Sequence, residues 1–305
     1  MSTLNLSTLN PAQLAATLAT EGPLLVLAGA GSGKTRVLTY RIAHLVENLG
    51  VSPYQILAIT FTNKAAAEMR SRLGQLLYDG ARGMWVATFH AMCVRMLRQD
   101  AELLGYTKNF TIYDDYDSRR LVKEIYAELD LNQKILSPNA ARELISRAKN
   151  ELVDPIEFEQ TTTIPFQKTA ARLYTRLQQR LRQVDAMDFD DLLFNASRLL
   201  SEHPEVLAAY QSRFRYILVD EYQDTNHAQY QLTTMLAAAH CNLMVVGDDD
   251  QSIYSWRGAD LRNILEFERD YPDAQVIKLE QNYRSTARIL NAANAVIAKN
   301  QSRKP

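Results

Sequence analysis

Cysteine is nearly absent from this sequence of 305 residues, which contains only Cys93 and Cys241. The two lie far apart and lack the spacing of metal ligands, which argues against a disulfide framework and against a cysteine metal site. We expect both thiols to be small core residues in a reducing compartment. Glycine and proline are also scarce, at 11 and 9 residues, and 47% of the chain is apolar, which excludes a disordered or low-complexity protein.

Long apolar runs and an excess of charge are missing as well. No uninterrupted apolar stretch approaches the roughly 18 residues that are needed to cross a bilayer. Residues 1–10 have neither the basic start nor the apolar core of a signal peptide, so we expect a cytoplasmic protein that does not enter a membrane. The formal net charge is −1, and a nucleic-acid partner would therefore need a local binding patch.

What the sequence does contain is a glycine-rich loop between an apolar strand and a helix. Residues 24–28 are apolar, and residues 29–35 read Gly-Ala-Gly-Ser-Gly-Lys-Thr. Glycines let successive backbone N–H groups face one anion, and the start of the helix adds further donors. Lys34 supplies a charge for the outer phosphates, and the Thr35 hydroxyl can ligate Mg²⁺. The pattern predicts a nucleoside-triphosphate site, with Ala28 where the usual motif has glycine.

Strands and helices alternate through much of the chain. Apolar strands are expected at 24–28, 56–61, 85–90, 216–219, 243–247 and 274–280. Helices are expected near 11–19, 35–48, 63–69, 91–104 and 286–298. This alternation predicts a parallel α/β sheet between two layers of helices, with ligands at the carboxyl ends of the strands. The polar strand tips at 60–64 and 88–90 would lie on that edge, although each also reads as an ordinary helix cap.

Residues 110–200 have a different texture, since strand signals disappear and helical spacing dominates. Helices are expected at 116–129, 138–150, 167–184 and 188–200. We interpret this segment as an all-helical domain inserted into the α/β domain. One of its helices carries a cation at every fourth position, at Lys168, Arg172, Arg176 and Arg180. This ridge could contact phosphates, or it could be a solvated face or pair with Asp188, Asp190 and Asp191.

Two carboxylates follow the apolar strand at 216–219. Asp220 at the strand tip can hold Mg²⁺, and Glu221 can polarise a water molecule for attack on a γ-phosphate. An acidic pair after a strand is a common turn, but together with Lys34 and Thr35 it indicates a site that hydrolyses a nucleoside triphosphate.

A third set of polar and aromatic residues follows the strand at 243–247. It comprises Gln251, Tyr254, Trp256 and Arg257. Such a set suits a segment with one side towards phosphate and the other towards stacked bases, although both aromatics could instead be core residues. Upstream of the phosphate loop, the amide of Gln13 could match the N6/N7 edge of adenine, or Gln13 could be an ordinary surface residue.

Taken together, these residues resemble the superfamily 1 helicases of the UvrD/Rep/PcrA group. The matching segments, in chain order, are 10–13, 28–35, 60–66, 88–90, 188–191, 220–224, 247–259 and 279–286. The family also has alanine at the position of Ala28. The order and spacing of the segments cover nearly the whole chain.

The resemblance implies a RecA-like P-loop NTPase that uses ATP and Mg²⁺. The nucleotide-binding residues that it implies are Gln13, Ala28, Gly29, Ala30, Gly31, Ser32, Gly33, Lys34, Thr35, Arg36, Tyr283 and Arg284. Gln13 would read adenine, and Tyr283 would stack on it. Thr35 and Asp220 would be the metal ligands.

The implied catalytic residues are Lys34, Asp220, Glu221, Gln251 and Arg284. Glu221 would be the base, Gln251 would sense the γ-phosphate and link it to DNA, and Arg284 would be an arginine finger. The implied DNA-binding residues are Phe61, Thr62, Asn63, Thr88, His90, Tyr254, Trp256 and Arg257. The aromatic residues Phe61, Tyr254 and Trp256 would form base-stacking pockets, and the others would contact the backbone or couple the two sites.

The family pattern also predicts the domain organisation. We expect a RecA-like domain in two parts, 1–109 and 201–280, a helical insert at 110–200, and the start of a second motor domain at 281–305. Family helicases continue into that second RecA-like domain, so we expect a monomeric piece of a longer protein. Its partners would be single-stranded DNA, single-strand/duplex junctions and the missing domain in cis. This chain would hydrolyse ATP slowly and would not unwind DNA alone, whereas the full protein would act in DNA repair or replication.

Two other functions share these motifs. The chain could be a nucleotide-dependent DNA-binding adaptor without helicase activity, although a pure binding protein has no need of Glu221. It could also be the motor part of a helicase–nuclease of the AddA/RecB type. The short insert and the Asp-Glu-Tyr-Gln-Asp form of residues 220–224 favour the UvrD type.

Overall fold

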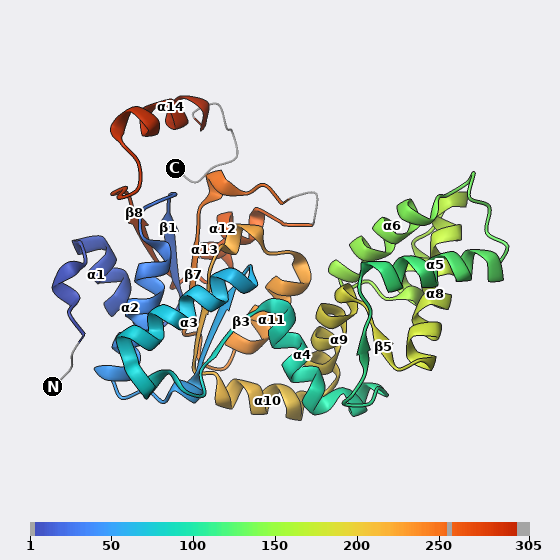
Figure 1. Cartoon of the computed structure of the whole chain (residues 1–305), viewed down its shortest axis with the longest axis horizontal. Helices are drawn as coiled ribbons and strands as arrows, with labels where there is room; N and C mark the ends of the chain where they lie inside the picture. The colour runs from blue at the N-terminus through green and yellow to red at the C-terminus, as the bar shows by residue number, and fades with distance from the viewer. Residues whose placement is uncertain (1–3, 255–257, 298–305) are drawn as a thin grey trace. The chain divides into compact units, whose positions relative to one another are not determined.

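The computed structural model describes residues 4–254 and 258–297 (Figure 1). The chain divides into two compact units. Unit 1 comprises Met1–Phe89, Ala208–Thr225 and Thr233–Pro305, and unit 2 comprises His90–Leu207 and Asn226–Leu232. These units are defined by packing alone, and the domain bounds expected from the sequence stay predictions. Within the described ranges, no helix is both long and apolar enough to cross a membrane.

Unit 1 is built on a six-stranded sheet whose order is β3-β2-β6-β7-β1-β8 and whose pairs are all parallel. The strands are β1 (Leu24–Ala28), β2 (Ile56–Thr60), β3 (Trp85–Thr88), β6 (Tyr216–Val219), β7 (Leu243–Gly247) and β8 (Gln275–Leu279). All residues of β2, β6 and β7 are buried, as expected for inner strands covered on both faces. The predicted parallel α/β sheet is confirmed.

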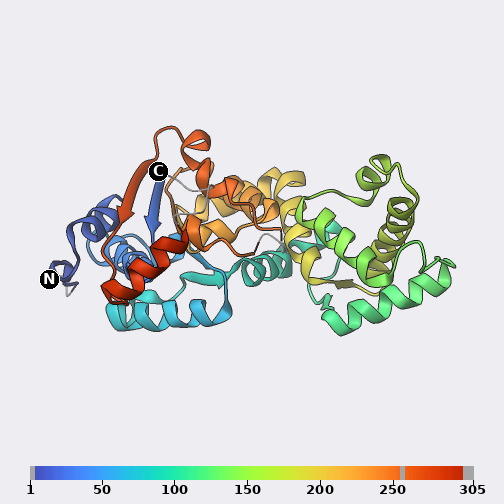
Figure 2. The same ribbon diagram turned by 90° about the horizontal axis from the view of Figure 1, so that it is seen from above.

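The phosphate-loop strand β1 lies between β7 and β8. Figure 2 shows β1, in blue, beside β8, in orange-red. Its register pairs Leu27 with Gly247 on β7 and Ala28 with Leu279 on β8. Because the strands are parallel, the residues that follow β1, β7 and β8 leave the sheet at the same edge. The register therefore brings together three segments that are far apart in the sequence.

The helices of unit 1 begin where the sequence provides caps. α1 (Pro11–Leu18) starts with a capping box between Asn10 and Gln13, and α3 (Asn63–Leu77) is capped by the Thr62 hydroxyl. α2 (Lys34–Glu47) begins directly after Gly33. α2 and α3 bury apolar residues in one core cluster with alternate residues of the strands, including Val37, Leu38, Ile42, Met69, Leu73, Leu24, Val26, Ile56 and Ala58.

The remaining helices of unit 1 are short or lie near the chain ends. They are α12 (Arg262–Leu265), α13 (Phe267–Asp270) and α14 (Ala287–Ile297), with most of α10 (Pro204–Arg213) and the later part of α11 (His227–Ala237). No residue of α14 is buried, so this helix adds nothing to the core of unit 1.

Unit 2 is largely helical. Its helices are α4 (Phe89–Asp100, from His90 on), α5 (Asp115–Glu128), α6 (Pro138–Asn150), α7 (Pro155–Gln160), α8 (Pro165–Gln183), α9 (Phe189–Glu202) and the first residues of α10 and α11. The apolar stripe of α8 packs with residues of α5 and α6 in a second core cluster, which includes Leu121, Ile125, Ile145, Leu173, Tyr174 and Leu177. The four helices predicted between 110 and 200 are confirmed within two residues at each end.

Three sequence-based expectations need correction. The strand expected at 85–90 ends at Thr88, and α4 begins at Phe89, so His90 lies in a helix rather than on a strand tip. The insert contains a two-stranded parallel ladder, β4 (Thr111–Ile112) with β5 (Ala186–Met187), because two residues are too few to leave a strand pattern. Cys93 is buried, and burial raises the pKa of its thiol, but Cys241 is exposed.

Candidate functional site

The phosphate loop joins β1 to α2 and needs glycine at two positions. Gly31 has φ of 79° and Gly33 has φ of 98°, a left-handed conformation that residues with a side chain rarely adopt. A Cβ atom at Gly31 would lie 2.6 Å from Cβ of Arg284, and one at Gly33 would lie 2.7 Å from Nε2 of Gln13. Both conformation and space therefore require the glycines that the motif predicts.

Lys34 is the first residue of α2, and its ammonium group is buried beside Glu221. Nζ of Lys34 lies 3.1 Å from Oε2 of Glu221, and 11% of the lysine side chain is exposed. The contact is a charge pair without hydrogen-bond geometry, and Nζ has no hydrogen-bond partner among the described residues. A buried donor without a partner is costly, so the ammonium is available for an anion.

Three acidic residues, Asp220, Glu221 and Asp224, follow β6 at the same edge of the sheet. Burial, together with the neighbouring charge of Glu221, raises the pKa of Asp220 to about 7, although Lys34 opposes this shift. Asp224 has its pKa raised to about 6, by burial and by Glu221. Desolvated carboxylates of this kind are stabilised by a cation. The oxygen donors of Thr35 and Asp220 suit Mg²⁺, which prefers hard oxygen ligands.

Glu221 has an unusual backbone conformation for a residue with a long side chain. Its φ is 51°, in the left-handed region, which costs on the order of 1–3 kcal/mol for a residue other than glycine. In this conformation Oε2 of Glu221 lies 3.1 Å from Nζ of Lys34. Strained residues of this kind concentrate at functional sites.

Two residues without a predicted role, Gln223 and Asp248, connect Glu221 with Gln251. Nε2 of Gln223 donates to Glu221 at 2.9 Å, and Oε1 of Gln223 accepts the Asp248 N–H at 3.1 Å. The Asp248 carboxylate in turn accepts a hydrogen bond from the Gln251 amide. A Cβ at Gly247 would lie 2.6 Å from Oε1 of Gln223, so this glycine makes room for the link. The sequence signal was a glutamine two residues after the predicted base.

The predicted adenine-binding residues lie beside the phosphate loop. Gln13 is buried, its Nε2 donates to the Ser32 carbonyl at 2.9 Å, and its Oε1 accepts the Asn10 N–H at 3.2 Å. Both ends of its amide therefore bind the protein, and recognition of adenine by Gln13 stays a prediction. The ring of Tyr283 is 61% exposed, and its hydroxyl accepts a hydrogen bond from Asn10 at 2.8 Å. This ring is accessible for stacking.

The two predicted arginines differ in their contacts. Arg36 donates to the Thr8 carbonyl at 3.0 Å and lies 5.4 Å from the centre of the Tyr40 ring, so it holds the segment before α1. Arg284 is exposed and forms no ion pair with any residue that the structure describes. Its backbone N–H donates to the side chain of Asn282 at 2.8 Å. Arg284 is thus held next to the phosphate loop by its backbone alone.

Part of the predicted DNA-binding set also lies in unit 1. The rings of Phe61 and Tyr254 lie 5.2 Å apart with a 32° tilt, which joins the ends of two strand–loop segments. The Thr62 hydroxyl accepts the Ala65 N–H at 3.1 Å as the cap of α3, whose first residue is Asn63. Thr88 ends β3 and is buried. Trp256 and Arg257 lie outside the described residues.

His90 belongs to unit 2, where it has an aromatic neighbour that sequence reasoning missed. The His90 ring lies 5.8 Å from the ring of Phe189, and 53% of Phe189 is exposed. The sequence signal was an aromatic residue inside the segment 188–191, directly after the cap of α9. His90 therefore lies in a partly exposed aromatic pair.

Two cations of the predicted basic ridge are bound within unit 2. Arg176 donates to Glu128 at 2.6 Å, and Arg180 donates to the same carboxylate at 2.8 Å. Arg180 also lies 3.4 Å from Glu124. These ion pairs join α8 to α5. The alternative of pairing with Asp188, Asp190 and Asp191 is therefore wrong for both arginines, since their partners lie on another helix.

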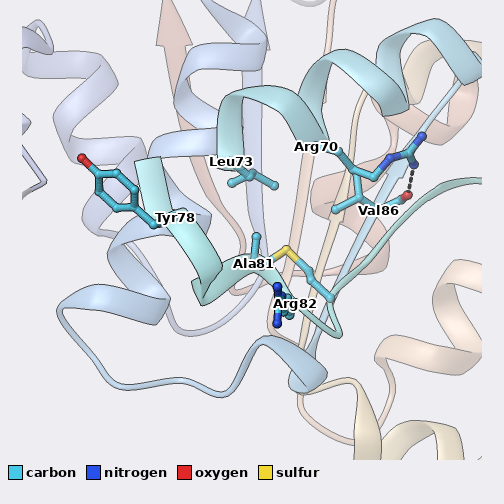
Figure 3. A pocket seen from close by; sticks show the side chains of 7 residues that line it. Arg70, Leu73, Tyr78, Ala81, Arg82 and Val86 are labelled. Carbon is cyan, nitrogen blue, oxygen red and sulfur yellow. Dashed lines mark hydrogen bonds between the residues drawn. The ribbon is translucent and has the colours of Figure 1, made fainter. Parts of the chain in front are cut away.

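A pocket of about 290 Å³ lies in unit 1 at the end of the sheet opposite the phosphate loop (Figure 3). It is lined by residues of α3, of the turn that follows and of β3, among them Arg70, Leu73 and Met84. Arg70 donates to the Val86 carbonyl at 2.6 Å. Because the pocket lies near the start of β3, it is separate from the carboxyl ends of the strands and from the phosphate loop.

Comparisons with known proteins agree with this geometry. Residues 9–272 match the family described as UvrD/REP helicase N-terminal domain. The chain is 53% identical over 298 residues to an ATP-dependent DNA helicase PcrA of Leuconostoc citreum, which covers 97% of this chain and 40% of that protein.

Two other PcrA helicases give similar values. That of Bacillus subtilis is 53% identical over 300 residues, with 98% of this chain and 41% of that protein covered. That of Staphylococcus aureus is 52% identical over 300 residues, again with 98% and 41% covered. The chain thus spans about two fifths of the length of these curated relatives. Since the family match extends over most of its residues, the chain belongs to the UvrD/REP helicase family and contains the N-terminal domain of that family.

Proposed function

We propose that this chain binds ATP with Mg²⁺ and hydrolyses the ATP, and that within a longer protein it is the motor half of a single-stranded-DNA translocase and DNA helicase. The observation that carries the proposal is the buried ammonium of Lys34 at the start of α2, 3.1 Å from Glu221 and with no hydrogen-bond partner among the described residues. An anion of high charge at the phosphate loop would complete the bonding of this group.

Thr35 and Asp220 would hold the Mg²⁺ ion. The raised pKa of Asp220 supports this assignment, because a buried carboxylate beside Glu221 gains from a neighbouring cation. When bound, Mg²⁺ neutralises charge on the phosphates. Thr35 begins α2 next to Lys34, so the metal and the phosphates would be held by consecutive residues.

Glu221 would act as the base. Its Oε2 lies beside the ammonium of Lys34 and accepts a hydrogen bond from the Gln223 amide. A γ-phosphate bound to Lys34 would compete for the ammonium, and Glu221, still held by Gln223, would then orient a water molecule and accept its proton. A change in the contacts of Glu221 would be transmitted by the hydrogen bonds of Gln223 and Asp248 to Gln251, and so to the segment that contains Tyr254.

Single-stranded DNA would bind at the aromatic residues. Phe61 and Tyr254 form one ring pair in unit 1, and His90 with Phe189 forms another in unit 2. Bases stack on such rings with little sequence preference, as a translocating motor requires. Unwinding would need the rest of the longer protein, because motion requires different grips on DNA in open and closed states. We place that protein in the cytoplasm, where it would act on single-strand/duplex junctions in repair or replication.

The proposal is tested by measuring ATP binding and ATP hydrolysis separately, with and without single-stranded DNA. Glu221→Gln should lower hydrolysis by about 10²–10⁴-fold, because the general base is lost, while ATP binding stays within a few-fold. Glu268→Gln, an exposed carboxylate on α13, is the matched control and should change neither. Hydrolysis by this chain alone is expected to be slow. A correctly placed arginine finger contributes roughly 10³–10⁵-fold to the rate, and the chain alone would lack that contribution.

Two results would contradict the proposal. The first is a parent chain that does not bind ATP. The second is a parent chain that binds ATP and DNA but shows no hydrolysis above that of Glu221→Gln, which would instead support a nucleotide-dependent adaptor.

A further inference from the structure

The carbonyl oxygens of the phosphate loop are all held by hydrogen bonds. Ser32 donates to the Gly29 carbonyl through its N–H at 3.2 Å and through Oγ at 2.7 Å, and the Val37 N–H donates to Gly33 at 3.0 Å. The other three donors come from outside the loop and helix: Asn282 Nδ2 to Ala30, Tyr283 N–H to Gly31 at 2.9 Å, and Gln13 Nε2 to Ser32 at 2.9 Å.

Holding a carbonyl oxygen also fixes the N–H of the next residue. A trans peptide is planar, and its C=O and N–H point in opposite directions. The bond from Asn282 to the Ala30 carbonyl therefore sets the direction of the Gly31 N–H. Gly31 lies at φ of 79° and has no Cβ, so little else opposes rotation of this peptide.

The orientation of the Asn282 amide follows from its own contacts. Its Oδ1 accepts two backbone N–H groups, those of Arg284 and Ser285, each at 2.8 Å. Only the amide oxygen can accept, so Nδ2 must face the Ala30 carbonyl. The oxygen of Asn282 thus shapes the turn that contains Tyr283 and Arg284, and its nitrogen holds the phosphate loop.

We propose that Asn282 is a positioning residue that directs the Gly31 N–H towards the phosphates of a bound nucleoside di- or triphosphate. The inference rests on the proposed nucleotide site and adds to it a residue more than 240 positions away in the sequence. Without the Asn282 donor, the Ala30–Gly31 peptide is free to turn its carbonyl oxygen towards the anion. A carbonyl in that position repels a phosphate and removes one N–H from the loop.

Two substitutions separate the two functions of the side chain. Asn282→Asp keeps an oxygen acceptor for the Arg284 and Ser285 N–H groups but loses the donor to Ala30. Asn282→Ala loses both. The matched control is Asn291→Ala, an exposed asparagine on α14.

The affinities of the chain for ADP and AMP provide the first measurement, both as competitors of a fluorescent ADP analogue. Asn282→Asp and Asn282→Ala should each lower the affinity for ADP by about tenfold, the effect of one lost hydrogen bond to a charged group. The affinity for AMP should change by less than about twofold, because the hydrogen bond from Asn282 to Ala30 orients an N–H group that faces the outer phosphates. Unchanged ADP affinity would overturn the proposal, and so would an equal loss for ADP and AMP, which would indicate general damage to the site.

Hydrogen exchange of the nucleotide-free chain provides a second measurement that does not depend on the proposed function. Asn282→Ala should speed exchange in peptides that cover 29–36 and 281–286 and leave strand β2 unchanged. Unchanged exchange at 29–36 would overturn the proposal even if the parent binds no nucleotide. A parent that binds no ADP would contradict the proposed function alone.

Discussion

Among the described residues, each of the two units contains a lysine whose ammonium group is buried beside acidic residues, and the two lysines are bound very differently. In unit 2, Lys149 is 1% exposed, and its Nζ lies 2.7 Å from Asp188 and 2.8 Å from Asp191. In unit 1, Lys34 lies 3.1 Å from one oxygen of Glu221, without a hydrogen bond. The first ammonium has two close carboxylates and the second has one.

The carboxylates show the same contrast. Burial, with a neighbouring carboxylate, raises the pKa of Asp191 to about 7 and that of Asp220 also to about 7. Asp191, however, accepts hydrogen bonds from the Asp188 N–H at 3.0 Å and from Gln178 at 2.9 Å, whereas the Asp220 carboxylate accepts only the Glu221 N–H, at 3.1 Å, among the residues described. Both aspartates are thus desolvated, but in the part of the chain that the structure describes the buried charged groups are satisfied by other groups of the protein around Lys149 and not around Lys34.

This difference separates a structural charge cluster from a binding site. A closed network holds its helices together, and here it joins α6 to the start of α9. An incomplete network leaves donors and acceptors that a ligand can satisfy. Similar buried charges therefore serve stability in one unit and, as we propose, nucleotide binding in the other.

The largest expected effect concerns Lys149. Lys149→Ala leaves two buried carboxylates without their cation, and breaking a buried pair in this way costs about 3–5 kcal/mol of unfolding free energy. Urea unfolding followed by circular dichroism measures the loss. Lys168→Ala, an exposed lysine on α8, is the control and should change stability by less than about 0.5 kcal/mol. A loss below about 1 kcal/mol for Lys149→Ala would contradict the structural role of the network.

The sequence predicted those parts of the molecule that depend on local patterns. The apolar strands at 24–28 and 243–247, and the loop at 29–35, were found because each is specified by neighbouring residues. The Lys149 network escaped detection because its partners lie on α9, about 40 residues away. Local periodicity contains no information on such pairs.

The same limit explains the missed parts of the site. Gln223 meets Asp248 only because β6 and β7 are neighbours in the sheet, and Asn282 meets Ala30 only because β8 pairs with β1. The pairing of the basic ridge could not be predicted for a related reason, since Glu128, which binds Arg176 and Arg180, lies on another helix about 50 residues away. Motif residues could be found from sequence, whereas the contacts that orient them depend on strand order and helix packing.

The next largest effect concerns Lys34 and should show the opposite pattern. Lys34→Met removes a buried charge that its own chain satisfies poorly, so the unfolding free energy should stay within about 1 kcal/mol of the parent. ADP affinity should instead fall by about 10–150-fold, equivalent to the 1.5–3 kcal/mol of a hydrogen bond to a charged group.

Urea unfolding and ADP titration of the same preparation measure both effects of Lys34→Met, and Lys149→Met, where it folds, is the matched comparison. If Lys34→Met destabilises the chain as much as Lys149→Ala, the contrast between the two lysines is wrong. Unchanged ADP affinity would contradict the assignment of Lys34 to the phosphates.

The smallest expected effect concerns the exposed ion pairs between α8 and α5, which the sequence alone left open as a phosphate-binding ridge. The bond from Arg176, then that from Arg180, lowers the pKa of Glu128 from its ordinary value of 4.5. A carboxyl group whose pKa is lowered by folding stabilises the fold at pH values above its ordinary pKa. This contribution disappears as the pH falls through the pKa of the folded state. The double variant Arg176→Gln and Arg180→Gln should therefore lower the thermal midpoint by about 1–2 °C at pH 7 and by nothing measurable at pH 3.

Arg172→Gln, whose guanidinium donates only to the Leu129 carbonyl at 3.4 Å in the described structure, is the control and should show no such pH dependence. DNA affinity should stay at the parental value in the double variant, because both guanidinium groups already bind Glu128. A lower affinity with a weaker salt dependence would instead show that these arginines leave Glu128 for the phosphates, and unit 2 would then contain a second incomplete charge cluster of the kind found around Lys34.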